Sequence, residues 1–169
     1  MSGNGTTPHL VIAQLVSEAK LHAEHIPFQG GSQALTNLIA GQIDFISDNV
    51  PVVLTSIEGG LVKPLGVSSS KRIPSLPNIP TIAEQGVPNF DYQGWILLVG
   101  PSRLPPAIVA RLNSEVEAIM KMPDVRKRFN DLGLVPMDMP RTDLAGFIGS
   151  ESDKWKEVVR VSGAAETTR

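Results

Sequence analysis

Apolar residues in the first part of the chain form short runs that turn residues separate from one another. Helical spacing predicts helices over 7–20, with Thr7 as cap, and over 32–41 and 51–59. Apolar runs with strand character lie between and after them, at 23–28, 43–47 and 61–68. Helices and strands that alternate in this way predict an α/β fold with a mostly parallel sheet.

After Pro101 the pattern changes to long amphipathic helices. Apolar residues at helical spacing mark three of them, beginning near Pro105, Pro123 and Thr142. Their stripes include Val109, Leu112, Val116, Phe129, Leu132, Phe147, Ile148, Trp155 and Val158. Strand character is nearly absent here apart from 134–136, so these stripes need another layer to cover them. The extended segment at 92–100 is the expected boundary between two units, 1–98 and 99–169.

Composition and charge exclude several classes of protein. The 169 residues carry a formal net charge of −2 with acids and bases mixed, so no basic stripe for nucleic acid is present. Without cysteine there are no disulfides and no thiolate sites. No apolar run approaches the ~18 residues of a membrane span. The first residues have neither a charged nor an apolar region, so they do not form a signal peptide.

Two glycine-rich turns, each leading into a predicted helix, are the candidate ligand loops. The first offers Gly5, Thr6 and Thr7, and the second offers Gly30, Gly31 and Ser32. Free amides and the positive end of the helix dipole at such a turn suit a carboxylate. A plain helix cap or a tight turn would use the same residues, so both interpretations stay open.

Two acidic residues have candidate roles. Asp48 follows the predicted strand at 43–47, where parallel sheets place ligand-binding groups, although capping the helix that Pro51 opens would also explain it. Glu151 falls on the apolar stripe of the last helix, so we expect a salt bridge or partial exposure rather than catalysis. Thr81 and Glu84 have the spacing of a capping box.

A serine hydrolase is the rival interpretation of the second turn. Residues 30–34 read GGSQA, which approaches a nucleophile elbow around Ser32. His9, His22 and His25 all precede that serine, opposite to the order of an α/β-hydrolase triad, although geometry rather than order decides. The histidine spacing fits no zinc pattern. We therefore expect neither catalysis nor a metal or other cofactor.

Four stretches carry a family resemblance. They read GNGTTPHL at 3–10, HIPFQGG at 25–31, LIAGQID at 38–44 and KRIPSLPNIPTIAEQGVP at 71–88. Together they resemble the Bug (TctC-like) solute receptors of tripartite tricarboxylate transporters. The resemblance spans nearly the whole chain and keeps its order.

The resemblance implies a type II periplasmic binding protein whose two lobes close over a small carboxylate and dock on a membrane permease. Residues 1–98 would be the second lobe, and 99–169 the helical C-terminal part of the first. It implies periplasmic location and assigns the ligand to Gly5, Thr6, Thr7, Gly30, Gly31, Ser32 and Asp48. Phe28 stands where the family commonly has tyrosine, so a phenolic hydrogen bond is lost there.

The N-terminal half of the first lobe has no counterpart in this sequence, so we expect a member truncated at its N-terminus. The helices after Pro105 would then lack their usual partner sheet. Large apolar patches rarely stay uncovered, so we expect a homodimer through these helices. Collapse of the helices onto the chain's own sheet is the alternative.

Overall fold

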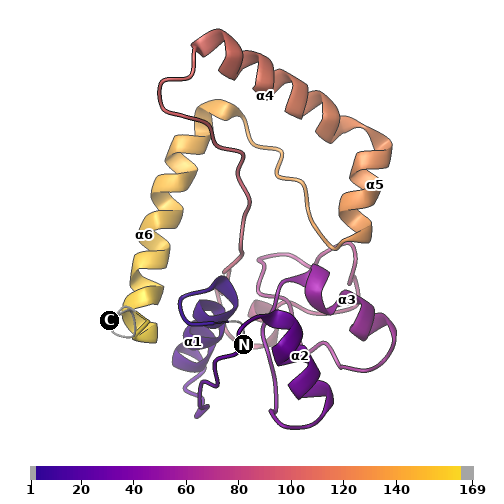
Figure 1. Ribbon diagram of the computed structural model, residues 1–169. Helices are drawn as coiled ribbons and strands as arrows, with labels where there is room; N and C mark the ends of the chain where they lie inside the picture. The colour runs from indigo at the N-terminus through magenta and orange to yellow at the C-terminus, as the bar shows by residue number, and fades with distance from the viewer. Residues whose placement is uncertain (1–2, 165–169) are drawn as a thin grey trace.

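Six α-helices and two 3₁₀ turns form the regular structure of residues 3–164. The computed structural model describes residues 3–164 (Figure 1). The elements are α1 (Thr7–Glu18), α2 (Gly31–Ile39), α3 (Val50–Glu58), η1 (Ala83–Gln85), α4 (Pro106–Lys121), α5 (Pro123–Asp131), η2 (Arg141–Asp143) and α6 (Leu144–Ser162). All six helices were expected from the apolar spacing, and α1, α3, α4 and α5 have a proline in their first two positions.

The ends of α1 differ slightly from the prediction. The N-cap is Thr6 rather than Thr7, and the Thr6 hydroxyl donates to the Gly3 carbonyl oxygen at 2.8 Å instead of capping the helix. The helix ends at Glu18, before Lys20, because Lys20 adopts a positive φ of 53°. Helix α2 ends as expected, with Gly41 in the left-handed region at φ 69°.

The predicted parallel sheet does not form within residues 3–164. The segments at 23–28, 43–47, 61–68 and 92–99 are mostly without regular structure, and the one parallel bridge described joins Val67 and Thr81. Val67 N–H donates to the Pro80 carbonyl oxygen at 3.0 Å, and Ile82 N–H donates to the Val67 carbonyl oxygen at 2.9 Å. An extended segment becomes a strand only when a neighbouring strand accepts and donates its backbone hydrogen bonds. Among residues 3–164 a complete bridge of this kind is described at Val67, and a single further hydrogen bond, from Tyr92 N–H to the Ser68 carbonyl oxygen at 2.9 Å, joins the segment at 92–99 to the one at 61–68.

A large open cavity lies where the predicted sheet would pack. Its volume is about 2520 Å³, and apolar side chains of the extended segments line much of it. Ile96, Leu98 and Val99 are 87%, 77% and 82% exposed. They belong to the segment that crosses the middle of the open frame formed by α6, α4 and α5 (Figure 1). In the segment at 92–99, the apolar side chains of Ile96, Leu98 and Val99 are therefore not covered by a second layer of helices or strands.

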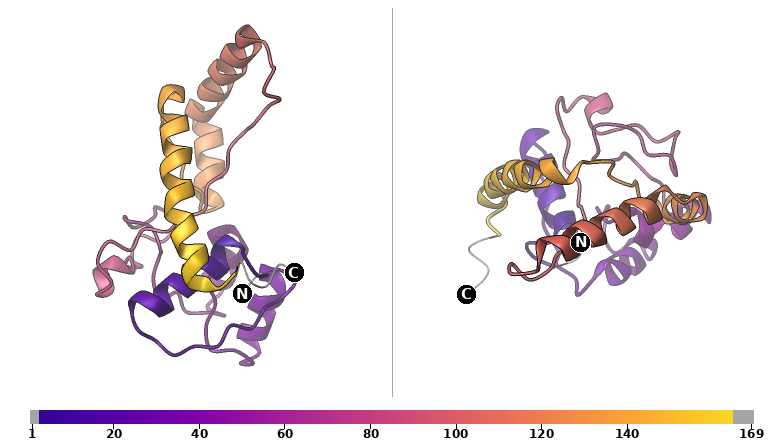
Figure 2. Two further views of the ribbon diagram at one scale, coloured as in Figure 1. Left: turned by 90° about the vertical axis from the view of Figure 1, so that its left-hand side faces the viewer. Right: turned by 90° about the horizontal axis from the view of Figure 1, so that it is seen from above.

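Helix α6 returns from the far end of the frame and packs against α1 (Figure 2). Leu10 of α1 is buried with Val158 and Ala164, and Tyr92 and Trp155 pack against this cluster. The two predicted units therefore touch each other through their helices.

A buried polar cluster fixes α6 to the segment at 92–99. Glu151 is 8% exposed and accepts hydrogen bonds from Trp95 Nε1 at 3.1 Å and Trp155 Nε1 at 3.0 Å. Lys154 forms an ion pair with the same carboxylate, as the sequence predicted for Glu151. Phe147 meets Trp95 edge to face, with ring centroids 5.7 Å apart. Both oxygens of the buried carboxylate therefore have partners, Oε2 in the two indole N–H groups and Oε1 in Lys154.

The predicted capping box is confirmed at η1. Glu84 N–H donates to Thr81 Oγ1 at 3.0 Å, and Thr81 N–H donates to Glu84 Oε2 at 2.7 Å. Arg72 pairs with the same carboxylate at 3.0 Å and so ties the proline-rich loop to this turn. This ion pair and the hydrogen bond from Thr81 hold the pKa of Glu84 below its usual range.

Gly133, just after α5, contacts Val50, the first residue of α3. It has φ 70°, and a methyl group built on it would lie 2.2 Å from Cγ1 of Val50. Only a residue without a side chain fits this contact.

We therefore expect Gly133→Ala to destabilise the fold by more than the ordinary cost of alanine at positive φ. That cost is about 1–2 kcal/mol, and the clash with Val50 adds about 1–3 kcal/mol. Gly41→Ala is the matched control, because Gly41 has φ 69° and no atom within 4 Å of an added methyl group. Urea unfolding of both variants measures the difference. Equal losses of stability would mean that Gly133 does not contact α3.

Candidate functional site

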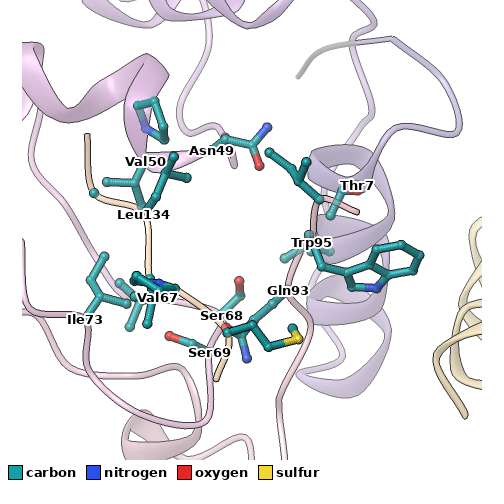
Figure 3. A pocket seen from close by; sticks show the side chains of 18 of the residues that line it. Thr7, Asn49, Val50, Val67, Ser68, Ser69, Ile73, Gln93, Trp95 and Leu134 are labelled. Carbon is teal, nitrogen blue, oxygen red and sulfur yellow. The ribbon is translucent and has the colours of Figure 1, made fainter. Parts of the chain in front are cut away.

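The N-termini of α1 and α3 meet at the edge of the central cavity. Thr7, the first residue of α1, and Asn49, the N-cap of α3, both line it. Gly94 lies between them, since a methyl group built on it would be 3.5 Å from Thr7 Cγ2 and 3.7 Å from Asn49 Oδ1. Figure 3 shows Thr7, Asn49 and Trp95 around this opening. Two helix N-termini and an extended segment therefore converge on one place.

These helix N-termini are not neutralised by their own side chains. The N-cap residues Thr6, Gly30 and Asn49 make no side-chain capping hydrogen bond, and no acidic residue stands in the first turn of α1, α2 or α3. The first amides of a helix have no partner within the helix, and the dipole adds a partial positive charge there. Such ends bind an anion without needing a lysine or arginine.

The first predicted ligand loop divides into one residue that faces the cavity and two that shape the turn. Thr7 lines the cavity. Gly5 N–H donates to His9 Nδ1 at 3.0 Å, and Thr6 N–H donates to the Gly3 carbonyl oxygen at 3.3 Å. Gly5 also supplies the positive φ, 76°, that the turn requires. In this structure Gly5 and Thr6 therefore position Thr7.

The second predicted loop lies behind the cavity wall. Gly30, Gly31 and Ser32 do not appear among the described residues that line the cavity. Gly31 packs against Asp48 so closely that a methyl group on it would be 2.2 Å from Asp48 Oδ2. Ser32 is exposed, and its carbonyl oxygen accepts from Thr36 Oγ1 at 3.0 Å. The structure thus brings Gly31 to Asp48 and leaves Ser32 on the surface.

Asp48 lines the cavity beside Asn49. Its Oδ1 accepts from Asn49 N–H at 2.8 Å, while Oδ2 is buried without a hydrogen-bond partner in the described structure. Burial raises the pKa of this carboxyl above its usual range. A carboxyl group that protonates more easily is a better neighbour for an anionic ligand, because its neutral form donates a hydrogen bond.

Sequence reasoning missed the polar groups on the far wall of the cavity. Ser68, Ser69 and Gln93 line it opposite Asn49 (Figure 3). Ser68 and Ser69 stand at the carboxyl end of the predicted strand at 61–68, which is the same signal that singled out Asp48. Gln93 had no such signal, because only packing of the 92–99 segment brings it there.

The histidines support the turn at residues 3–7 rather than a hydrolase site. His9 and His25 stack with ring centroids 4.2 Å apart, and they bond to Gly5 and Asn4. Ser32 lies on α2 and has no histidine among its described partners. Residues 3–164 contain no group of three or more metal-ligating side chains. None of the helices over those residues is long and apolar enough to cross a membrane.

Comparison with known proteins gives consistent relatives. The family described as tripartite tricarboxylate transporter family receptor matches residues 1–164. A Pseudomonas sp. protein from a tcbD–tcbE intergenic region is 35% identical, over 94% of this chain and 47% of the relative. A Pseudomonas knackmussii protein from a clcB–clcD intergenic region is 34% identical over 94% of each chain. BugT of Bordetella pertussis is 31% identical over 95% of this chain and 49% of its own.

Solved structures show the same fold. A Rhodopseudomonas palustris protein solved with adipate has a TM-score of 0.84 at 28% identity and covers 94% of this chain, which spans 53% of it. MatC of the same species, solved with bound malate, has a TM-score of 0.77 at 32% identity, over 94% of this chain and 56% of MatC. The periplasmic binding protein BugD has a TM-score of 0.75 at 25% identity, over 96% of this chain and 56% of BugD.

The chain spans about half the length of these solved structures and of two of the three curated relatives. The predicted α/β binding-protein fold is confirmed as one part of such a structure, and the predicted family is confirmed by the match over 1–164. The chain therefore belongs to the tripartite tricarboxylate transporter receptor family of solute-binding proteins.

Proposed function

We propose that this chain is the carboxylate-capturing part of an extracytoplasmic solute receptor that serves a tripartite tricarboxylate transporter. The observation that carries the proposal is the meeting of α1 and α3 at Gly94, with both helix N-termini lacking side-chain caps. Two neighbours of this fold were solved with adipate and malate, and both of these ligands are dicarboxylates.

One ligand carboxylate lies at the N-termini of α1 and α3 in this proposal. Pro8 and Pro51 have no N–H, so the donors to the oxygens of this carboxylate are the amides of Thr7 and Val50, the first residues of the two helices, and the Asn49 side chain adds an amide donor. The rest of the ligand reaches along the cavity wall toward Ser68 and Gln93, where it exchanges water for hydroxyl and amide groups.

The lobe assignment follows from the same family. Residues 1–98 supply the second lobe with its ligand turns, and 99–169 supply the helical C-terminal part of the first lobe. In the periplasm the loaded receptor would dock on the permease. Because the cavity is open on one side in this chain, a ligand gains only part of the contacts of a closed cleft, so we expect a Kd of about 1 mM.

The first test of this proposal uses calorimetry or thermal shift with adipate and malate. Both are expected to bind, and Gly94→Val is expected to weaken binding at least 10-fold, because its side chain fills the space between Thr7 and Asn49. Gly100→Val is the control in the same segment, since the atom that a methyl group there would approach, at 3.4 Å, belongs to Leu104. If sugars, amines or nucleotides stabilise the protein and carboxylates do not, the proposed ligand class is wrong.

The absence of catalysis is tested with a serine-directed fluorophosphonate and an activated ester. We expect no labelling of Ser32 and no turnover, because the histidines bond to Gly5 and Asn4 instead of the serine hydroxyl. Ser32→Ala serves as the control for background labelling. Stoichiometric labelling that this variant abolishes would establish an esterase.

We propose further that two copies associate through α4 and its neighbours. Leu112, Val116 and Ile119 lie on α4 and are 47%, 38% and 48% exposed. Burying each such side chain is worth about 1.5–3 kcal/mol, which favours a two-fold interface over an exposed stripe.

Light scattering over a dilution series tests this association. A dimer is expected at micromolar concentration, and Val116→Lys and Phe129→Lys are expected to dissociate it by placing a charge in the interface. Lys121→Glu is the control, because Lys121 is exposed at the end of α4 and outside the apolar stripe. A monodisperse monomer at that concentration would overturn the dimer.

A further inference from the structure

A pair of stacked histidines stands directly behind the turn at residues 3–7. His9 lies in the first turn of α1 and is 6% exposed, and His25 comes from the segment at 21–28 that follows α1. Their ring centroids are 4.2 Å apart with an interplanar angle of 25°. The stack joins the helix that begins at Thr7 to the segment that leads into the second glycine-rich turn.

Each ring also holds one residue of the turn. His9 Nδ1 accepts the Gly5 N–H at 3.0 Å, and His25 Nε2 lies 2.7 Å from Asn4 Oδ1. These bonds define the protonation state. An Nδ1 that accepts a hydrogen bond carries no proton, so His9 is neutral with its proton on Nε2. The carbonyl oxygen of Asn4 can only accept, so Nε2 of His25 carries a proton, and the buried Nδ1 without a hydrogen-bond partner favours the neutral ring with Nδ1 bare.

A proton added to either ring meets an unfavourable site. On His9 it would place an N–H against the Gly5 N–H and break that hydrogen bond. On His25 it would create a buried N–H at Nδ1, an atom that is buried and has no hydrogen-bond partner in the described structure. With both rings charged, two cations would face each other across the stack.

Each ring, once protonated, is a positive charge that faces the other ring across the stack. Burial lowers the pKa of both histidines below the ordinary value of about 6.5, and the charge of His9 lowers that of His25 further.

We infer that His9 and His25 are positioning residues for the ligand turn, and that their protonation releases this turn and its bound carboxylate in mildly acidic solution. The inference rests on the proposed function, since Thr7 at the end of this turn is the residue that faces the ligand. The pair does not touch the ligand. It sets the direction of the backbone that leads into the first amides of α1.

The direction of the pH dependence follows from the geometry. The opened turn binds protons more readily than the ordered turn, so protons favour the opened form. The turn at residues 3–7 is fully ordered above the ordinary histidine pKa of about 6.5. It loses this order as the pH falls below that value toward the lowered pKa of the two histidines.

Without any ligand, NMR titration of the full chain from pH 7.5 to 5.0 tests the pair itself. The rings of His9 and His25 are expected to titrate below the ordinary histidine value of about 6.5, and the Gly5 amide signal is expected to follow His9. His9→Asn keeps an acceptor oxygen near the position of Nδ1 but takes up no proton in this range, so the Gly5 signal should stop titrating. Titration of the His9 and His25 rings at the ordinary histidine value would overturn the inference.

With adipate as the probe, calorimetry at pH 7.5 and 5.5 tests the effect on binding. The double variant His9→Asn with His25→Gln keeps both hydrogen bonds to the turn and loses both titrating groups. Affinity of the unmodified protein is expected to fall at least 5-fold more than that of the double variant between the two pH values. The protonation of adipate is common to both proteins and cancels in this comparison.

His22→Asn is the control and should behave as the unmodified protein does. Equal losses of affinity in the unmodified protein and the double variant would show that the pair has no role in release. If adipate and malate bind at neither pH, the proposed function fails, and the NMR titration still decides whether the pair holds the turn.

Discussion

The contact between α6 and α1 holds the two ends of this chain together, and the remaining structure depends on it. Val158 and Ala164 cover Leu10, while Glu151 receives the indole protons of Trp95 and Trp155. Burial of the apolar residues drives the packing of α6 on α1. The Glu151 carboxylate fixes the orientation of α6 against the segment at 92–99, because its donors come from both. Once α6 is anchored, the segment at 92–99 has a defined path beside α1, and Gly94 reaches Thr7.

The same anchoring leaves a broad open cavity that α1 lines on one side. Apolar residues such as Ile96 and Val99 point to a layer that residues 3–164 do not provide, and the extended backbone beside them has few partners. Parallel strands are normally buried on both faces. The matched parts of the solved relatives comprise about half of each chain, which agrees with an incomplete set of layers.

The two glycine-rich turns illustrate how the proposed binding site would use helix N-termini to hold an anion. The N-termini of α1 and α3 line the cavity, and residues that do not line it hold these two helix ends in place. Gly5 and His9 hold the entry to α1, and Gly31 allows Asp48 to pack against α2. A site of this kind depends on the exact position of backbone amides, so its supporting contacts matter as much as the residues that face the ligand.

The sequence alone determined the six helices, the capping box at Thr81 and Glu84, and the family, because each of these depends on local spacing or on residues that are contiguous in the chain. It also predicted that Glu151 forms a salt bridge. It did not predict the stack of His9 on His25, the meeting of Thr7 with Gly94, or the loss of the parallel sheet. Those features depend on which distant segments pack together, and strands in particular exist only when a neighbouring segment completes their hydrogen bonds.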